Sequence, residues 1–239
     1  MSLISLTHIV KTYRTGDETL HVLKDVNLTV NTGEFLAIMG PSGSGKSTMM
    51  NIMGLLDNFD AGVYTLNNQD VTHLNENQRA HVRNKEIGFV FQSFNLMPRM
   101  TLLENVALPM VYAGIGRGER KDRAADALTQ VGLGDRVDHQ PNEISGGQMQ
   151  RVAIARAIVN RPAVIMADEP TGNLDSHTSL EIVRIFQQLN AAGTTIVMVT
   201  HEPDIAQYAK RIVSFRDGIV QKDEPVANPP QLFSQEVSS

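Results

Sequence analysis

The segment from Gly40 to Ser47, Gly-Pro-Ser-Gly-Ser-Gly-Lys-Ser, matches the spacing G-x-x-x-x-G-K-[ST] of a phosphate-binding loop. Its glycines let backbone N–H groups curl around phosphate oxygens, and a helix starting there adds its positive end. Lys46 is expected to reach the β- and γ-phosphates of a nucleotide, and Ser47 to bind Mg²⁺. A merely flexible glycine loop is the alternative, which the preceding apolar strand and the following helical pattern disfavour. The residues expected to hold phosphate are Gly40, Ser42, Gly43, Ser44, Gly45, Lys46, Ser47 and Thr48.

Two adjacent carboxylates, Asp168 and Glu169, end the apolar run 163–167. Successive side chains of a strand point to opposite faces, but at its end two neighbours can diverge toward one cavity. One carboxylate can hold Mg²⁺, and the other can accept a proton from an attacking water. A solvated acidic turn would explain the dipeptide alone. Together with a phosphate loop, the pair predicts a magnesium–nucleotide site.

Three single residues are further candidates for the same site. His201 and Gln92 each follow an apolar strand, so His201 could donate to a γ-phosphate and the Gln92 amide could reach Mg²⁺ or the water. Both also fit as ordinary strand-end residues. Tyr13, one of four tyrosines in a chain without tryptophan, offers an aromatic face for a base, although edge-strand packing explains it equally well.

A second glycine turn, Ile144-Ser145-Gly146-Gly147-Gln148, opens another expected helix. A hydroxyl at a helix N-terminus and two glycines with open N–H groups repeat the physics of the phosphate loop, but no lysine accompanies them. A plain helix cap needs the serine and hardly needs two glycines and a glutamine. By pattern alone, the cap and a second phosphate site remain equally open.

The apolar runs must form the elements that position these residues. Apolar strands that alternate with helices predict an α/β fold with a mostly parallel sheet covered on both faces, and ligands bind at the carboxyl ends of such strands. The β-formers near the N-terminus predict an antiparallel hairpin with a turn at Thr15–Asp17. Strands are expected at 3–13, 20–30, 34–39, 62–67, 86–91, 163–167, 194–200 and within 211–221, and helices at 46–56, 101–131 with a break near 114–118, 147–160 and 177–190.

The composition narrows the function classes. The chain has 239 residues and a net charge of −5, which argues against nucleic acid as a partner. The absence of cysteine excludes disulfides, thiolate zinc sites and iron–sulfur clusters. No apolar run approaches the ~20 residues of a membrane span, and no secretory signal is visible, so we expect any membrane contact to go through a partner.

The order of these motifs resembles the ATP-binding cassette (ABC) transporter ATPases over nearly the whole chain. The resemblance rests on Tyr13, Gly40–Thr48, Gln92, Ile144–Gln148, Val164–Glu169, Gly172–Asp175 and His201. It implies a P-loop NTPase (RecA-like) core, an N-terminal antiparallel β subdomain and a helical subdomain at about 93–160. The ATPase domain would span 1–222. The segment 223–239 is mostly polar and contains prolines, a composition that predicts a peripheral or disordered tail.

The resemblance also implies roles. Tyr13 would stack on the adenine of ATP, Glu169 would be the general base, and His201 and Gln92 would sense the γ-phosphate and the water. Mg²⁺ would be held by Ser47, Gln92 and Asp168. The Ser145–Gln148 turn would contact the γ-phosphate of ATP bound to a second copy, with Asp175 in the loop that couples the two sites. The implied assembly is an ATP-dependent, isologous homodimer with two shared ATP sites, bound to an integral membrane permease at the cytoplasmic face of the cell membrane.

Three segments resemble the macrolide-exporter, antimicrobial-peptide and lipoprotein-releasing branch, which favours export or mechanotransmission. They are Asn51–Asp57, Phe91–Pro98 and Gly172–Asp175. An importer ATPase, a soluble non-transport ABC protein and a simple phosphate-loop kinase are the alternatives. The apolar set after Gln92 fits either the core of the helical subdomain or a groove for a permease helix; it comprises Phe94, Leu96, Met97, Met100, Leu102 and Leu103.

Overall fold

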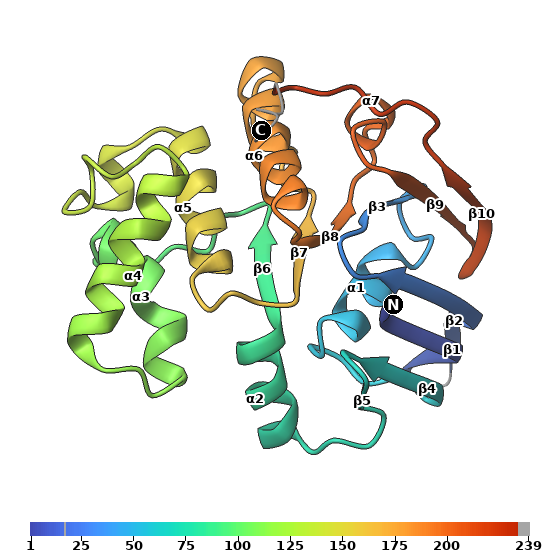
Figure 1. The fold of residues 1–239 in the computed structure, drawn as a ribbon. Coiled ribbons are helices and arrows are strands. Elements are labelled where there is room, and N and C mark those ends of the chain that lie inside the picture. The colour runs from blue at the N-terminus through green and yellow to red at the C-terminus, as the bar shows by residue number, and fades with distance from the viewer. Residues whose placement is uncertain (17, 234–239) are drawn as a thin grey trace.

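The computed structural model describes residues 1–16 and 18–233 (Figure 1). Its strands are β1 (Ser2–Thr15), β2 (Glu18–Asn31), β3 (Phe35–Met39), β4 (Ala61–Leu66), β5 (Gln69–Asp70), β6 (Ile87–Phe91), β7 (Val164–Asp168), β8 (Thr195–Val199), β9 (Arg211–Arg216) and β10 (Ile219–Pro225). Its helices are α1 (Lys46–Met53), α2 (Glu76–Glu86), α3 (Leu102–Tyr112), α4 (Arg117–Gln130), α5 (Gly146–Ile158), α6 (Ser176–Ala191) and α7 (Pro203–Ala206), with a short 3₁₀ turn at Pro141–Glu143.

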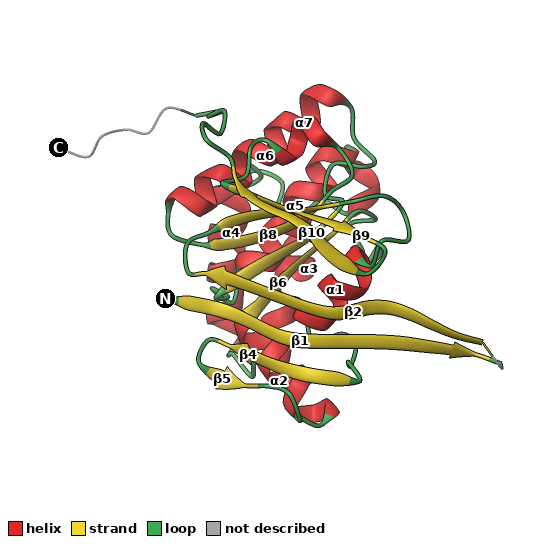
Figure 2. Ribbon diagram, turned by 90° about the vertical axis from the view of Figure 1, so that its right-hand side faces the viewer, coloured by secondary structure: helices red, strands yellow, loops and turns green. Residues whose placement is uncertain are grey.

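The strands form two sheets. One has four strands in the order β2-β1-β4-β5, all antiparallel, and the other has six in the order β10-β9-β3-β8-β7-β6. In the larger sheet only the edge pair β10–β9 is antiparallel. Figure 2 shows the two sheets stacked, with α1 near the space between them. The predicted α/β fold with an N-terminal antiparallel sheet is confirmed.

Both faces of the larger sheet are buried. On β7, Val164 and Met166 belong to a core shared with α1 and the smaller sheet, whereas Ile165 and Ala167 belong to a second core with α3 to α6. This alternation explains why the strands are continuous apolar runs. The carboxyl ends of β3, β8, β7 and β6 are consequently neighbours at one edge of the sheet.

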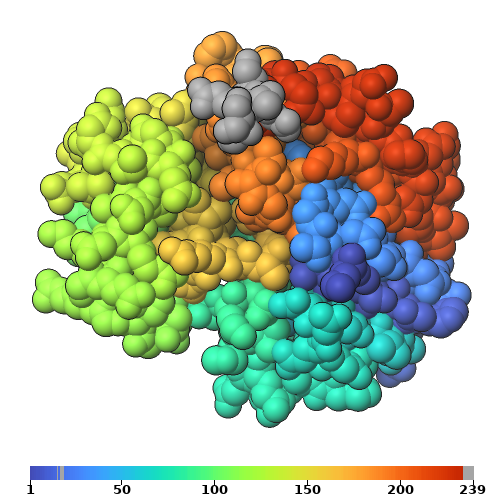
Figure 3. Space-filling model, viewed as in Figure 1, coloured from blue at the N-terminus to red at the C-terminus, as the bar shows by residue number. Residues whose placement is uncertain are grey.

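Helices α3, α4 and α5 pack together as a lobe beside the sheet. In Figure 3 this lobe, coloured green to yellow, stands apart from the blue and red body on the face shown. The expected break in the first helical stretch is confirmed, since α3 ends at Tyr112 and α4 begins at Arg117. No helix among residues 1–16 and 18–233 is long and apolar enough to cross a membrane.

Three expectations about the elements were wrong. Helix α1 ends at Met53 instead of residue 56. Helix α2 was missed because it buries only Arg79 and Val82 and so has no apolar periodicity; its signal is the capping box of Asn75 and Gln78.

The third concerns the last strand, which was expected to end within 211–221. Strand β10 continues to Pro225, and the Gln187 side chain donates to the Pro230 carbonyl at 2.7 Å and accepts from the Leu232 N–H at 3.0 Å. Residues 230–232 are therefore held against α6. Asp17 of the predicted turn and residues 234–239 lie outside the described part of the chain.

Candidate functional site

The loop between β3 and α1 has the geometry of a phosphate cradle. A Cβ on Gly40 would lie 2.2 Å from the Phe215 carbonyl oxygen, and the φ of 151° there also requires glycine. Lys46 is 8% exposed, and its Nζ donates to the carbonyls of Gly40 and Pro41 at 2.7 and 2.9 Å. The buried Ser44 Oγ has no hydrogen-bond partner among the described residues. The loop thus keeps a cation and a hydroxyl ready for an anionic ligand.

Tyr13 is held in place by two residues that the sequence did not single out. Its hydroxyl donates to Asp57 Oδ2 at 2.6 Å, and Lys11 Nζ lies 4.8 Å from its ring centroid. Lys11 also donates to Asp57 Oδ1 at 2.9 Å, which closes the triangle. Burial, and next the Asp57 hydrogen bond, raise the pKa of Tyr13, so the phenol remains a donor. The ring is 38% exposed and leaves a face for a ligand.

Glu169 and His201 form a pair at the ends of β7 and β8. His201 Nδ1 lies 2.8 Å from Glu169 Oε2, and the His201 backbone N–H donates to the same oxygen at 3.3 Å. Glu169 itself has a φ of +46°, a left-handed conformation that is rare for a residue with a side chain and is often found at functional sites. This backbone turn aims the carboxylate at the sheet edge.

Asp168 lies beside Glu169 and near Lys46. Burial, and next the Glu169 carboxylate, raise the pKa of Asp168, while Lys46 opposes the shift. Ser47, Asp168 and Gln92 carry hydroxyl, carboxylate and amide oxygens, the hard donors that Mg²⁺ prefers. These residues fit a magnesium ion.

Gln92 is turned toward a neighbouring loop. Its Nε2 donates to Asn173 Oδ1 at 3.3 Å, and Asn173 Nδ2 donates to the Gln92 carbonyl at 3.1 Å. Gln92 would have to rotate to reach a bound ion or water.

The second glycine turn caps its own helix. Ser145 Oγ accepts from the Gln148 N–H at 3.3 Å, and Gln148 Oε1 accepts from the Ser145 N–H at 2.9 Å. A Cβ on Gly147 would lie 2.4 Å from Thr178 Cγ2 of α6, so packing alone requires this glycine. A Cβ on Gly146 would meet nothing closer than 3.6 Å. The cap is therefore real, but it leaves Gly146 unexplained.

Asp175 likewise caps a helix. Its Oδ1 accepts from the Thr178 N–H at 3.0 Å and its Oδ2 from the Thr178 hydroxyl at 2.6 Å. These bonds, the side-chain one first, lower the pKa of Asp175. The residue starts α6 close to the Gly147 contact, which links the loop to the second glycine turn.

One cavity of about 970 Å³ collects most of the predicted residues. Those lining it are Tyr13, Gly40, Ser42, Gly43, Gly45, Lys46, Ser47, Thr48, Glu169 and His201. Ser44, Gln92 and Asp168 do not line it, nor do Asp175 and the turn at 145–148. Sequence reasoning missed Leu20, Val22, Met39, Pro41 and Ser214. Leu20 could have been found, since folding the hairpin about its turn places it opposite Tyr13.

The phosphate loop, the two sheets and the carboxylate pair define a phosphate-loop NTPase. A family model described as ABC transporter matches residues 23–172. An uncharacterised ABC transporter ATP-binding protein of Bacillus subtilis, YknY, is 56% identical over 216 residues, which are 90% of this chain and 94% of its own. The macrolide export ATP-binding/permease protein MacB of Syntrophobacter fumaroxidans is 52% identical over 97% of this chain, which spans only 33% of that relative.

The solved structures agree. The ATP-binding cassette MJ0796, as a dimer in a post-hydrolysis state bound to ADP and Pi, matches with a TM-score of 0.86 and 43% identity, covering 94% of this chain and 99% of that one. The chain belongs to the ABC transporter family. It is an ATP-binding cassette, the ATPase unit of that family, and its resemblance to the macrolide-exporter branch is confirmed.

Proposed function

We propose that this cassette hydrolyses magnesium ATP as a head-to-tail homodimer and drives a separate membrane permease, in export or mechanotransmission. One observation carries the proposal. The turn at 145–148 has the features of an anion site, yet it does not line the cavity that holds Lys46 and Glu169. A second copy, related by a two-fold axis, would place this turn on the partner's nucleotide and make two shared sites. The MJ0796 cassette in both matched structures is a dimer.

The chemistry follows from the residues in the cavity. Glu169, oriented by its backbone and by His201, accepts the proton of the attacking water. Lys46 exchanges its two carbonyl partners for phosphate oxygens. Held by Ser47, Asp168 and Gln92, Mg²⁺ would offset charge on the transferred phosphoryl group. Tyr13 stacks on the base. Gln92 leaves Asn173 to join the site, which frees the loop that contains Asp175 from this side-chain contact.

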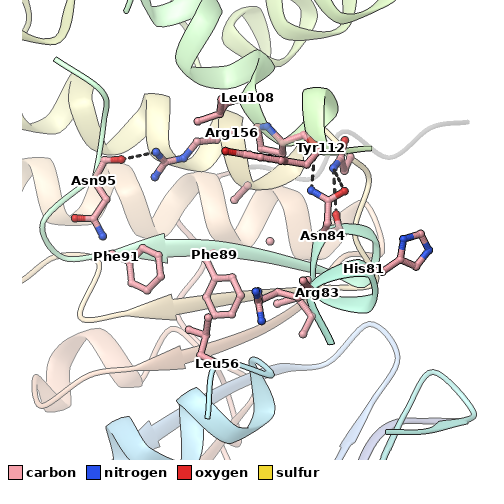
Figure 4. Close-up of a pocket in the computed structure, with 16 residues that line it drawn as sticks. Leu56, His81, Arg83, Asn84, Phe89, Phe91, Asn95, Leu108, Tyr112 and Arg156 are labelled. Carbon is pink, nitrogen blue, oxygen red and sulfur yellow. Dashed lines mark hydrogen bonds between the residues drawn. The ribbon is translucent and has the colours of Figure 1, made fainter. Parts of the chain in front are cut away.

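A groove of about 730 Å³ between the sheet and the helical lobe is the proposed seat of the permease (Figure 4). Phe89, Phe91 and Tyr112 supply apolar surface, and Arg83 and Arg156 add positive charge. Both guanidiniums bond only backbone carbonyls in the described structure. Such a groove suits an amphipathic helix.

The apolar set predicted from the sequence occupies a different place. None of Phe94, Leu96, Met97, Met100, Leu102 and Leu103 lines the groove. Leu102 is fully buried, and Leu96 and Leu103 pack on the core of the helical lobe. Met97 is exposed beside it. The groove is built mainly by α2, β6 and α3, and α2 is a helix that sequence reasoning missed.

The permease also sets the proposed location. The MacB relative is named an ATP-binding/permease protein and YknY an ABC transporter ATP-binding protein. We therefore place the chain at the cytoplasmic face of the membrane, held there by a permease and not by lipid. The net charge of −5 argues against nucleic acid as a partner.

The dimer is tested with Glu169→Gln, which should bind ATP, turn it over very slowly and accumulate as a dimer in size-exclusion chromatography. Adding Ser145→Arg should abolish the dimer and, in the wild-type background, the ATPase activity. Nucleotide titration of the monomer should be unchanged. Loss of ATP binding by the Ser145→Arg monomer would refute the shared site, and full turnover by Glu169→Gln would refute the base.

The groove is tested with Tyr112→Ala. Tyr112 is 77% exposed at the groove, so its truncation should spare folding and weaken co-purification with the permease. Val111→Ala is the matched control, since Val111 is exposed on the same helix but outside the groove. Equal permease binding by the two variants would remove the groove from the proposal.

A further inference from the structure

Gln150 is a buried polar residue on α5 whose contacts the proposed chemistry does not use. Its side chain is fully buried, and its Nε2 donates to the Pro170 carbonyl at 2.7 Å. Its Oε1 has no hydrogen-bond partner among the described residues. Turning the amide over would set Oε1 against the Pro170 carbonyl oxygen, so the orientation is fixed.

This arrangement is a poor way to stabilise a core. A buried acceptor without a donor is unfavourable, and an apolar side chain of similar size would avoid it. The neighbours Val152, Ala153 and Ile154 on the same helix are all buried and apolar. The one interaction that an apolar residue could not make is the bond to Pro170.

That bond holds the backbone next to Glu169. Pro170 has no N–H and follows a residue at φ +46°, and the Gly172 N–H closes the turn by donating to the Glu169 carbonyl at 3.1 Å. The Glu169 N–H donates to the Val199 carbonyl at 2.9 Å, and the Thr171 hydroxyl donates to Glu202 at 2.6 Å. Those two contacts hold the turn from the β8 side. Gln150 holds it from α5.

We propose that Gln150 is a positioning residue that fixes the general base Glu169 and links it to the turn at 145–148 on the same helix. The inference rests on the proposed function. In the dimer, the turn contacts the nucleotide of one site, whereas Glu169 acts in the other. A shift of α5 caused by the first nucleotide is passed through Gln150 to the backbone of the second site's base.

Gln150→Met tests the link, because methionine matches the volume and cannot donate. Gln187→Met is the matched control. Gln187 is also buried, and its Nε2 also donates to carbonyls, those of Tyr208 and Pro230, but on α6 away from the cavity.

We expect Gln150→Met to lower kcat about tenfold or more, since small displacements of a catalytic group are costly, with KM for ATP within about twofold. The Hill coefficient for ATP should fall toward one. Gln187→Met should leave kcat and the Hill coefficient as in the wild type.

Gln150→Glu gives a second measurement if the methionine variant folds poorly. A buried carboxyl has a raised pKa, and its protonated form can donate to the Pro170 carbonyl. The ratio of kcat for Gln150→Glu to kcat for Gln150→Met should therefore be high at low pH and decline as pH rises. Equal kcat for Gln150→Met and Gln187→Met, or a ratio independent of pH, would overturn the inference. Full turnover by Glu169→Gln would instead overturn the proposed function, so the two failures are distinguishable.

Discussion

Two helices of this cassette begin with glycine-rich turns, and the turns differ in how they satisfy their own N–H groups. Helix α1 starts at Gly45, which has a φ of 102° and no side chain to cap the helix. Helix α5 starts at Ser145, which forms a reciprocal capping box with Gln148. The first four N–H groups of a helix lack internal partners. At α1 a ligand must supply them, whereas at α5 the protein supplies part of them itself.

This difference assigns the two turns different roles, ligand binding at the start of α1 and stabilisation of the fold at the start of α5. The α1 turn keeps Lys46 buried, and its Ser44 hydroxyl has no partner among residues 1–16 and 18–233, so a bound anion would add a contact that the turn lacks. The α5 turn is stable by itself and presents an exposed Ser145. Such a turn can contact a nucleotide that is bound to a second copy of the chain. Changes at α1 should therefore affect nucleotide binding by the monomer, and changes at α5 should affect stability and dimer function.

The largest effect is expected for Lys46→Ala. Loss of a charged donor to phosphate costs about 1.5–3 kcal/mol, which is roughly a 10- to 150-fold loss of affinity. Fluorescence titration of the monomer with an ATP analogue measures it. Gln148→Ala is the matched change at the second turn and should leave this affinity within about twofold. A comparable loss in Gln148→Ala would mean that the two turns serve one nucleotide.

Gly147→Ala should have the next largest effect, on stability. The new Cβ would lie 2.4 Å from Thr178 Cγ2, and overpacking of this kind costs about 1–3 kcal/mol. Thr178→Ser removes that methyl group and keeps the hydroxyl that donates to Asp175. The double variant should regain most of the loss in urea unfolding. Without such rescue, the glycine would be required by a ligand and not by α6.

The sequence predicted the motifs better than their surroundings. The phosphate loop, the carboxylate pair and His201 were found because each follows a long apolar strand, and apolar runs report burial directly. The parallel order of those strands then brings their ends together, as predicted. Local spacing and strand burial were sufficient for this part of the site.

Contacts between distant segments could not be predicted. Asp57 holds Tyr13 across 44 positions, and Thr178 explains Gly147 from another helix. The hydrogen bond from the Leu232 N–H to Gln187 Oε1 joins segments 45 positions apart. In each case the signal is a tertiary hydrogen bond or a close packing contact, which leaves no local pattern.

Ser145→Ala should have a smaller effect than Gly147→Ala. It removes the cap of α5, and loss of such a cap typically costs about 1 kcal/mol. Thermal unfolding of the nucleotide-free monomer measures the loss, and Ser145→Asp, which preserves the cap, is the control. If Ser145→Ala left the unfolding midpoint unchanged, the capping box would not stabilise α5 and the contrast with α1 would fail.

The smallest expected effect is a gain in stability instead of a loss, and it concerns Asp168, close to the α1 turn. Burial and the Glu169 carboxylate raise the pKa of Asp168 above its ordinary value. The folded state then binds its proton more tightly than the unfolded state does, so stability falls as pH rises from the ordinary value through the raised one. Asp168→Asn does not titrate and should unfold at a higher temperature than the wild type at pH 7 in EDTA, with the difference in unfolding temperature closing toward pH 4.

Asp175→Asn is the control, because the pKa of Asp175 is lowered and its carboxylate stabilises the fold above its ordinary pKa. That variant should lose stability at pH 7. The nucleotide cavity would then be destabilised by its own residues when no ligand is bound, whereas α5 and α6 are capped without a ligand. This arrangement is expected if selection at the α1 turn favours ligand binding over stability. Equal shifts in the two variants would show that no such difference exists.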